Sequence, residues 1–444
     1  MNDEIAQKVM EAETEYFTAG RGPWRERLAF VVEMMRDMSR QTDPQEMVKA
    51  YGRFMDRIRE VDRFVSLSRR ELIKPWYRIT RSDLIDPEDQ INPWKQRDKL
   101  PLYDRGLLGE LIYGDEPRII DDLEGLIAPD DPAKAHFEGM RSLQAVPNYD
   151  DGVAQNMVVM MDRKPGAFRP DTLPERVWMS NLFGRATQNL VLRDQVQTMY
   201  EAVDRELKVV GDIQRSLLPT ELPQIPTLEL AAHYQTSTRA GGDYYDFFEM
   251  PDGRWGILIA DVSGHGTPAA VMMAVTHSIA HMHDGPPDPP SQLLAFINQH
   301  LARRYTNGTG SFVTAFYGIY DPRVRSLTYA SAGHPAMRIQ CGEKVGPLDA
   351  KPCLPLGIEG DERYVDATIT FAPGDLLVLY TDGITEAHDP KRDEMFGQER
   401  LDKVLCSQCA DAKGLVHKVL EAVDEFTGYR TPEDDRTLLV AKVL

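Results

Sequence analysis

The sequence predicts an α+β protein in which two globular domains are joined by a long helix. At 444 residues the chain exceeds what one ordinary hydrophobic core accommodates. Its first part mixes strand-like and helix-like runs, its middle carries an unbroken helical pattern, and its last part alternates many short strands with a few helices. Antiparallel strands with interspersed helices favour a two-sheet sandwich that is covered by helices.

The N-terminal region, about residues 20–185, is expected to form one mixed domain. A helix should begin after Asp43, because Asp at the N-cap, Pro44 at the first helical position and Glu46 at the capping-box position all favour a helix start. A short helix is expected at 106–114. The strand-like runs of this region are 63–67, 77–80, 119–120, 143–146 and 157–161.

Residues 186–218 are expected to form a helical linker. No Gly or Pro occurs from 186 to 210, and Pro219 ends the pattern because it cannot continue a helix. Apolar side chains alternate in steps of four and three, which is the heptad pattern of a two-stranded coiled coil. The seam positions are Leu192, Val196, Met199, Val203, Glu206, Val210, Ile213 and Leu217. We therefore expect a homodimer through this linker; the alternative is one amphipathic helix lying against its own domain.

Residues 220–444 alternate strands with helices. Turn-forming residues such as those at 251–253 separate several strand-like runs and favour antiparallel hairpins. Helices are expected from Thr267 and Pro268, an N-cap and first-turn pair, to about His281, from 291 to 304, and within 397–427.

Charge and composition exclude several classes of function. The chain has a net charge of −19, and residues 201–444 hold 35 acidic and 22 basic side chains, a net charge of −13. Such an acidic region repels a phosphate backbone, so nucleic acid is not expected as a partner, whereas divalent cations are attracted. No apolar run approaches the roughly 18 residues needed to span a bilayer. The acidic N-terminus lacks the pattern of a signal peptide, so we expect a cytoplasmic protein.

The four cysteines all lie in the C-terminal half. Cys406 and Cys409 form a C-x-x-C motif, but no second pair accompanies it, and it lies in an expected helix. We interpret these thiols as ordinary helix residues rather than as a redox or zinc site.

Four aspartates recur where an expected strand meets a loop. They are Asp243, Asp261, Asp382 and Asp435, each beside glycines or inside a turn. One Asp-Gly pair alone predicts only a turn. Together, carboxylates at strand ends can hold hard divalent cations such as Mg²⁺ and Mn²⁺, which prefer oxygen ligands.

The stretches around these aspartates resemble the SpoIIE-like (RsbU-like) branch of the metal-dependent serine/threonine protein phosphatases, the PPM family. The resemblance covers 205–444 and implies an α/β/β/α sandwich with two divalent cations, Mn²⁺ or Mg²⁺, at one edge. The stretches, in order, are GGDYYDFFEM, ILIADVSGHGTPAA, FVTAFYGIYD, SAGHPA, PLG, APGDLLVLYTDGITEA, FGQERL and EDDRTLLV.

The resemblance also implies which residues hold the metals. Its ligands would be Asp261 bridging both ions, Asp243 and the backbone carbonyl of Val262 on one ion, and Asp382 and Asp435 on the other. Asp434 is the alternative to its neighbour Asp435, and Asp246 either assists through a water or is a residue on the surface of its strand. Asp261 and Asp382 would be catalytic, because the two ions acidify a water that attacks phosphorus.

Several other side chains have two interpretations. His265 is either a general acid or a loop residue, because the eukaryotic members carry D-G-H-G where this chain has D-V-S-G-H-G. Arg239 is the nearby candidate for a phosphate-binding arginine. His277 and His281 have the H-x-x-x-H spacing of a helical zinc site but lack the adjacent Glu of a metalloprotease, so we assign them to the helix. His334 in SAGHPA is expected to shape a turn.

The N-terminal region resembles a GAF domain, a sensory module, with a PAS-type module as the alternative. The carriers are 106–114 followed by EPRIIDDL, then RSLQAVP and MVVMMDRKPGAF. The combined resemblances imply a phosphatase regulated by an unknown small-molecule or protein signal. They also imply a phosphoserine or phosphothreonine substrate, often a STAS-domain anti-sigma-factor antagonist. The alternative is a catalytically silent scaffold, which the intact aspartate set disfavours.

Overall fold

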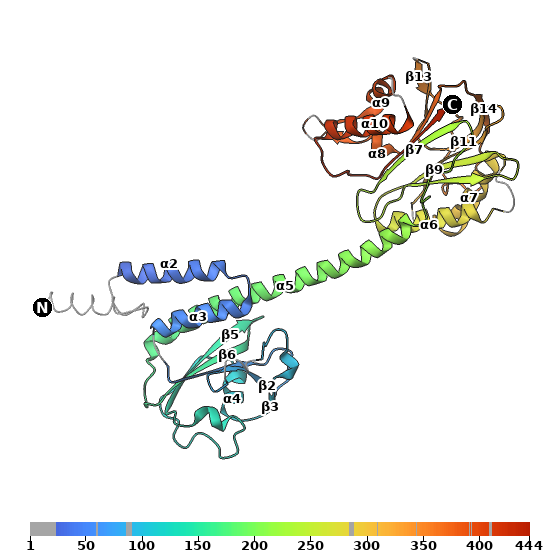
Figure 1. The fold of residues 1–444 in the computed structure, drawn as a ribbon. Coiled ribbons are helices and arrows are strands. Elements are labelled where there is room, and N and C mark those ends of the chain that lie inside the picture. Colours follow the sequence, from blue (N-terminus) through green and yellow to red (C-terminus); the bar gives the residue numbers. More distant parts are fainter. Residues whose placement is uncertain are drawn as a thin grey trace. The chain divides into compact units, whose positions relative to one another are not determined.

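The structure, a computed structural model, describes residues 24–58, 61–85, 91–283, 288–308, 310–342, 344–389, 391, 393–407 and 411–444. It divides into two compact units, Met1–Tyr200 and Glu201–Leu444 (Figure 1). The linker predicted at 186–218 spans the division between these units. The boundaries predicted for the flanking domains, 20–185 and 220–444, remain predictions.

A six-stranded antiparallel sheet forms the centre of the N-terminal unit. Every strand-like run predicted in this region falls within an observed strand. In sheet order the strands are β3 (Leu102–Tyr103), β2 (Tyr77–Ser82), β1 (Arg63–Ser68), β6 (Val153–Asp162), β5 (Ser142–Asp150) and β4 (Arg118–Ile120).

Helices pack on this sheet and on one another. The short helix α4 (Leu107–Gly114) buries Leu108 and Ile112 against the sheet, as predicted for 106–114. Asp43 caps the helix that was predicted to begin after it, since its carboxylate accepts hydrogen bonds from the backbone N–H groups of Gln45 and Glu46. The other elements of the unit are α2 (Trp24–Arg40), α3 (Pro44–Ile58) and the 3₁₀ turns Arg97–Lys99, Lys134–Phe137 and Pro170–Thr172.

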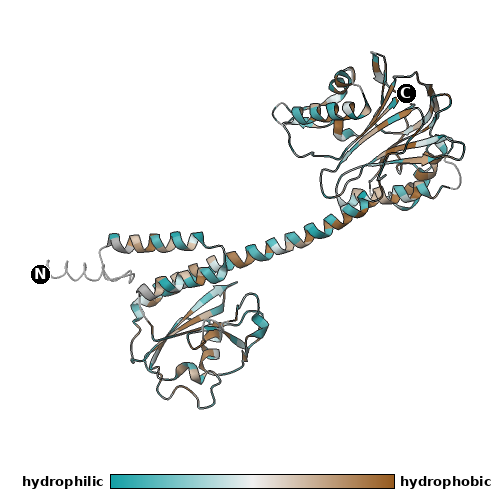
Figure 2. Ribbon diagram, in the orientation of Figure 1, coloured by the Kyte–Doolittle hydropathy of each residue, from teal (hydrophilic) through white to brown (hydrophobic). Residues whose placement is uncertain are grey.

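One helix, α5 (Leu173–Arg215), runs through the predicted linker (Figure 1). It begins before residue 186, and it ends ahead of Pro219, as the sequence predicts. Hydrophobic residues recur among hydrophilic ones along its length (Figure 2), and the seam side chains of Val196 and Met199 are 65% and 69% exposed. An exposed apolar seam agrees with pairing to a second helix, and the coiled-coil dimer stays a prediction.

Two five-stranded antiparallel sheets form the centre of the C-terminal unit. The first sheet contains, in order, β14 (Ala367–Thr370), β11 (Ser326–Ala332), β10 (Val313–Asp321), β9 (Trp255–Val262) and β8 (Tyr244–Glu249). The second sheet contains β13 (Lys344–Pro347), β12 (Arg338–Cys341), β15 (Leu376–Tyr380), β18 (Arg436–Val443) and β7 (Leu228–Gln235). A small ribbon pairs β16 (His388–Asp389) with β17 (Glu394–Met395).

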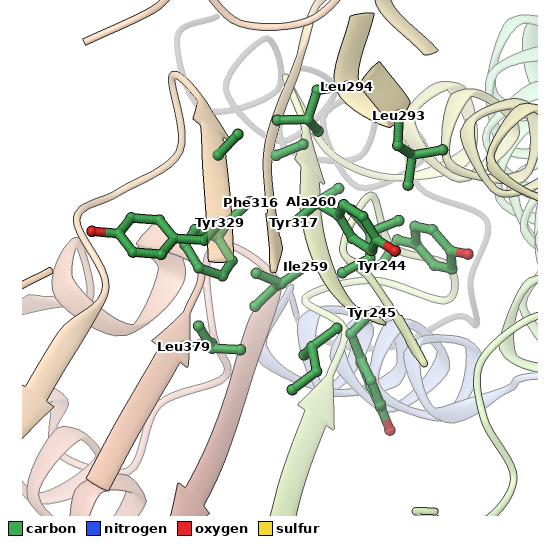
Figure 3. Packing of buried hydrophobic residues seen from close by; sticks show 14 of the residues in the cluster. Tyr244, Tyr245, Ile259, Ala260, Leu293, Leu294, Phe316, Tyr317, Tyr329 and Leu379 are labelled. Atoms are coloured by element: carbon green, nitrogen blue, oxygen red, sulfur yellow. The ribbon is translucent and has the colours of Figure 1, made fainter. Parts of the chain in front are cut away.

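The sheets stack face to face, and helices cover both outer faces, as the α/β/β/α prediction requires. Leu377 and Leu379 of β15 join the core of the first sheet, whereas Val378 and Tyr380 point to the opposite side, where α10 packs. Figure 3 shows Leu379 near Ile259 between the sheets. The first sheet is covered by α6 (Thr267–His281) and α7 (Pro290–Arg304), and the second by α8 (Asp382–Thr385), α9 (Gly397–Leu405) and α10 (Ala412–Thr427).

One helical prediction is wrong at its end. Helix α9 stops at Leu405, so Cys406 lies just beyond it and is exposed rather than inside a helix. Cys409 lies outside the described residues. Within the described part of the chain, no helix has the length and apolar character needed to cross a membrane.

Candidate metal centre

Four strand ends meet at one edge of the sandwich, and each carries a predicted aspartate. In the first sheet Tyr244 pairs with Ala260, which places Asp243, just before β8, beside Asp261 near the end of β9. In the second sheet Tyr380 pairs with Leu438, so Asp382, just after β15, comes beside the residues that precede β18. Antiparallel register therefore supplies two pairs of acidic positions, one from each sheet.

Asp243 links the two sheets through threonine hydroxyls. Its Oδ2 atom accepts hydrogen bonds from Oγ1 of Thr381 at 2.8 Å and from Oγ1 of Thr437 at 2.5 Å. Both threonines belong to the second sheet, and both are fully buried, as is Asp243 at 1% exposure. Sequence reasoning missed these threonines, although each lies within two residues of a predicted aspartate, in Y-T-D-G and D-R-T.

Two glycines allow the backbones to approach closely at this edge. A Cβ on Gly242 would lie 3.1 Å from the carbonyl oxygen of Val262, which places that oxygen beside the residue preceding Asp243. A Cβ on Gly383 would lie 2.0 Å from the backbone oxygen of Asp435, a distance that no side chain tolerates. The glycines of the A-G-G-D and T-D-G motifs thus bring the strand ends together.

The carboxylates repel one another, and their environment favours the protonated forms. The pKa of Asp261 is raised by burial and then by the charges of Asp243, Asp382 and Asp434. The pKa of Asp243 is raised chiefly by burial, and that of Asp382 rises to about 6 through burial and the charge of Asp434.

No lysine or arginine among the described residues compensates for this charge. None of them lies within ion-pair distance of Asp243, Asp261, Asp382 or Asp434. An all-oxygen set of mutually repelling carboxylates fits divalent cations of the Mg²⁺ or Mn²⁺ type, because these ions would neutralise the repulsion.

Asp434 and Asp435 occupy different environments. Asp435 is 3% exposed, and its two carboxylate oxygens accept hydrogen bonds from the backbone N–H groups of Ser237 (2.8 Å) and Gly242 (2.7 Å). The Ser237 hydroxyl adds a third at 3.2 Å. Asp434 is exposed, and its charge raises the pKa of both Asp261 and Asp382. One oxygen of Asp434, Oδ1, accepts a hydrogen bond from the backbone N–H of Asp435 at 2.8 Å. Donors from another loop therefore hold both oxygens of Asp435, whereas Asp434 has a single local donor and acts on the cluster through its charge.

Two predicted side chains lie on the loops around the centre. His265 is exposed in the loop before α6. Burial is the main cause that raises the pKa of Asp434, and the charge of His265 acts in the opposite direction and lowers it. Arg239 forms two hydrogen bonds with the carboxylate of Asp204 on α5, at 2.9 and 3.1 Å. Arg239 is thus engaged with the helix rather than extended toward the aspartates.

His334 has a larger role than shaping a turn. Its Nε2 atom lies 3.1 Å from the backbone oxygen of Tyr380, and its Nδ1 atom lies 2.8 Å from Oγ1 of Thr314, the cross-strand partner of Asp261. Because a carbonyl can only accept, Nε2 carries the proton and the threonine hydroxyl donates to Nδ1. Burial lowers the pKa of His334 to about 4, so the ring is neutral and ties the strand ends of the two sheets together.

The C-terminal unit is similar to proteins of known family. A family model described as Stage II sporulation protein E (SpoIIE) matches residues 251–444. The phosphoserine phosphatase RsbU of Bacillus subtilis is 31% identical over 250 residues, which cover 54% of this chain and 71% of RsbU. The chain belongs to the RsbU-like SpoIIE family of PPM phosphatases. Membership of this family makes it a protein serine/threonine phosphatase.

Two further proteins are similar to part of this phosphatase. The phosphoserine phosphatase RsbP of Bacillus subtilis is 26% identical over 184 residues, 41% of this chain and 45% of RsbP. A solved structure of the SiaA-PP2C domain of Pseudomonas aeruginosa aligns with a TM-score of 0.49 at 23% identity, covering 55% of this chain and 99% of that one.

Proposed function

We propose that this RsbU-like phosphatase holds two divalent cations, Mn²⁺ or Mg²⁺, in the carboxylate cluster and hydrolyses phosphoserine or phosphothreonine on a protein. The observation that carries the proposal is the gathering of carboxylates from both sheets at one edge, with raised pKa values and no compensating cation among the described residues. The proposed ligands are Asp261 for both ions, Asp243 and the Val262 carbonyl for one ion, and Asp382 and Asp434 for the other.

In this assignment Asp435 is a positioning residue instead of a ligand. Its carboxylate receives backbone N–H groups from the segment that leads into Asp243, so it fixes the course of that segment. Thr381 and Thr437 orient the Asp243 carboxylate in the same way.

Bound divalent cations supply Lewis-acid activation of water and neutralise charge on the phosphoryl group. The carboxylates of this chain hold the ions and set their charge, and a thiol nucleophile is not needed. We assign His265 the role of proton donor to the leaving serine oxygen, because it is a histidine on the exposed loop that acts on Asp434.

The substrate that we propose is a phosphorylated STAS-domain protein of a partner-switching circuit. Support comes from the similarity to RsbU, which is described as a phosphoserine phosphatase. We place this reaction in the cytoplasm.

We also propose that the N-terminal unit is a GAF-like or PAS-like sensor and that α5 carries its signal in a homodimer. The support is a contact at the end of α5: Asp204 pairs with Arg239, and a Cβ on Gly211 would lie 2.1 Å from the Arg239 carbonyl oxygen. The segment that contains Arg239 continues directly into Asp243, so a shift of α5 would displace Asp243, a proposed metal ligand. A regulatory ligand must favour one arrangement of the helix over another to act in this way.

The test is phosphate release from phosphorylated candidate STAS-domain proteins encoded alongside this chain, measured with Mn²⁺, with Mg²⁺ and with EDTA. The proposal expects release that depends on the metal and stops in EDTA. Release that persists in EDTA would contradict the metal centre. No release from any phosphoprotein with either metal would favour a catalytically silent scaffold.

A further inference from the structure

A second group of ligating side chains lies at the C-terminal end of α6. His277 and His281 are one turn apart on the helix, with ring centroids separated by 4.5 Å, and Asp246 of β8 faces them. The three side chains each offer a ligand atom, and these atoms lie within 4.8 Å of one another. Across the described ranges, no other trio of His, Cys, Asp and Glu side chains meets this criterion.

The carboxylate of Asp246 is held in one orientation. Its Oδ2 atom accepts a hydrogen bond from the Tyr244 hydroxyl at 2.6 Å, and its Oδ1 atom accepts one from the backbone N–H of Phe247 at 2.7 Å. Nε2 of His281 lies 2.7 Å from the same Oδ2 atom. Outer hydrogen bonds of this kind orient the carboxylate ligands of metal sites.

The group combines a rigid inner side with an accessible outer side. Asp246 is 9% exposed, and the ring of His277 packs against Tyr244 at 5.5 Å between centroids. The His281 side chain is 45% exposed, so solvent and small ions can reach it. A hydrogen bond between Asp246 and His281 accounts for two members of the group but not for the position of His277.

We propose that Asp246, His277 and His281 form a second metal site, which takes Zn²⁺ or a similar imidazole-binding transition-metal ion. Two imidazoles on one helical face and one carboxylate match the three-ligand sites of zinc, which leave a fourth position for water. Mg²⁺ prefers oxygen ligands and therefore has little affinity for this set. The ligand chemistry separates this site from the all-oxygen centre described above.

The geometry needs only a small adjustment to admit the ion. Zinc bonds to His and Asp of about 2.0–2.2 Å place tetrahedral ligand atoms about 3.4 Å apart. The 2.7 Å separation of His281 Nε2 and Asp246 Oδ2 must therefore widen by less than about 1 Å, which a side-chain rotation of the accessible His281 provides. The bound ion would link the C-terminal end of α6 to β8.

The test is the zinc content of the full-length protein after dialysis against Zn²⁺ with a large excess of Mg²⁺, which occupies the carboxylate centre. The proposal expects one zinc per chain in the wild type and none in the His277→Ala/His281→Ala variant. His417→Ala, which removes an exposed histidine of α10, is the matched control and should keep its zinc. Asp382→Asn should also keep it, so a failure of the phosphatase proposal would not affect this result.

A second readout guards against a folding defect in the double variant. Co²⁺ bound to two imidazoles in a four-coordinate site absorbs visible light strongly, whereas Co²⁺ in an all-oxygen site absorbs weakly. The strong band should be present in the wild type, be reduced in His281→Gln and vanish in the double variant, with circular dichroism unchanged. A wild type without bound zinc, or a folded double variant that binds as much zinc as the wild type, would overturn the proposal.

Discussion

Replacing Thr437 by valine tests how the second sheet holds Asp243. Valine has nearly the shape of threonine, so the substitution removes one hydroxyl donor without opening a cavity. The lost hydrogen bond, 2.5 Å from Thr437 Oγ1 to Asp243 Oδ2, is fully buried and runs to a carboxylate. Thr381 remains as the other hydroxyl donor to the same oxygen.

The size of the effect follows from the charge of the acceptor. A hydrogen bond to a charged group contributes about 1.5–3 kcal/mol, and one pKa unit corresponds to about 1.4 kcal/mol. Losing the donor should therefore raise the pKa of Asp243 further, because the Thr437 hydrogen bond opposes the rise that burial causes. Protons then compete better with the cation at neutral pH, so we expect the Mn²⁺ affinity to fall by about 10–100-fold, the range typical of residues that orient metal ligands.

The assay is the phosphatase rate as a function of Mn²⁺ concentration at pH 7. Thr437→Val should need about 10–100-fold more Mn²⁺ for half its maximal rate and should approach the wild-type rate at saturating metal. Thr328→Val, which removes a hydroxyl that pairs with Thr368 on the surface of the first sheet, is the control and should behave as wild type. If Thr437→Val has the wild-type requirement for Mn²⁺, the hydroxyl does not act on Asp243 as argued.

Three further predictions concern other parts of the chain. Cys406→Ser combined with Cys409→Ser should leave the phosphatase rate nearly unchanged, and a large loss in a folded protein would reveal a thiol role. Val203→Asp/Val210→Asp should convert a dimer into a monomer in sedimentation experiments, whereas an unchanged mass would show that the linker does not pair through this seam. Burial holds the pKa of His334 near 4, below its ordinary 6.5, so the unfolded chain binds this proton first and stability should fall as pH drops from about 6.5 to 4. His334→Gln should remove up to about 3 kcal/mol of that pH dependence in urea unfolding, and an unchanged pH dependence would contradict a buried neutral ring.

Local patterns predicted the elements that position the centre. Thr267 and Pro268 marked the start of α6, and the observed helix runs to His281 as expected. Glycines beside Asp243 and Asp382 marked two of the strand ends, because the close approach of the backbones at Gly242 and Gly383 leaves little or no room for a Cβ. Such features depend on residues that are neighbours in the sequence, so they can be predicted from the sequence alone.

The choice between Asp434 and Asp435 depends on contacts that no local pattern encodes. The donors to Asp435, Ser237 and Gly242, lie 198 and 193 positions away in the chain. Adjacent acidic residues in a turn look equivalent in the sequence, and only the packing of this distant loop determines that both oxygens of Asp435 accept hydrogen bonds from it, whereas Asp434 accepts one from its neighbour. The end of α9 before Cys406 is a smaller case of the same kind, since the helical pattern around it did not show where the helix stops.

The position of Asp246 beside the α6 histidines also depends on contacts between residues that are distant in the sequence. The His277 and His281 spacing was visible in the sequence, but their carboxylate partner comes from β8, 35 positions before His281. Strand pairing and helix packing bring the three side chains together.

The most direct test of the metal centre compares phosphate release by the wild type, Asp382→Asn, Asp434→Asn and Asp435→Asn at saturating Mn²⁺ on one phosphoserine protein substrate. The account predicts that Asp382→Asn and Asp434→Asn lose activity by orders of magnitude while circular dichroism shows the wild-type fold. Asp435→Asn should lose stability in urea unfolding and retain measurable turnover, because its oxygens bind backbone N–H groups instead of the ions. Wild-type activity in Asp382→Asn or Asp434→Asn would contradict the proposed centre.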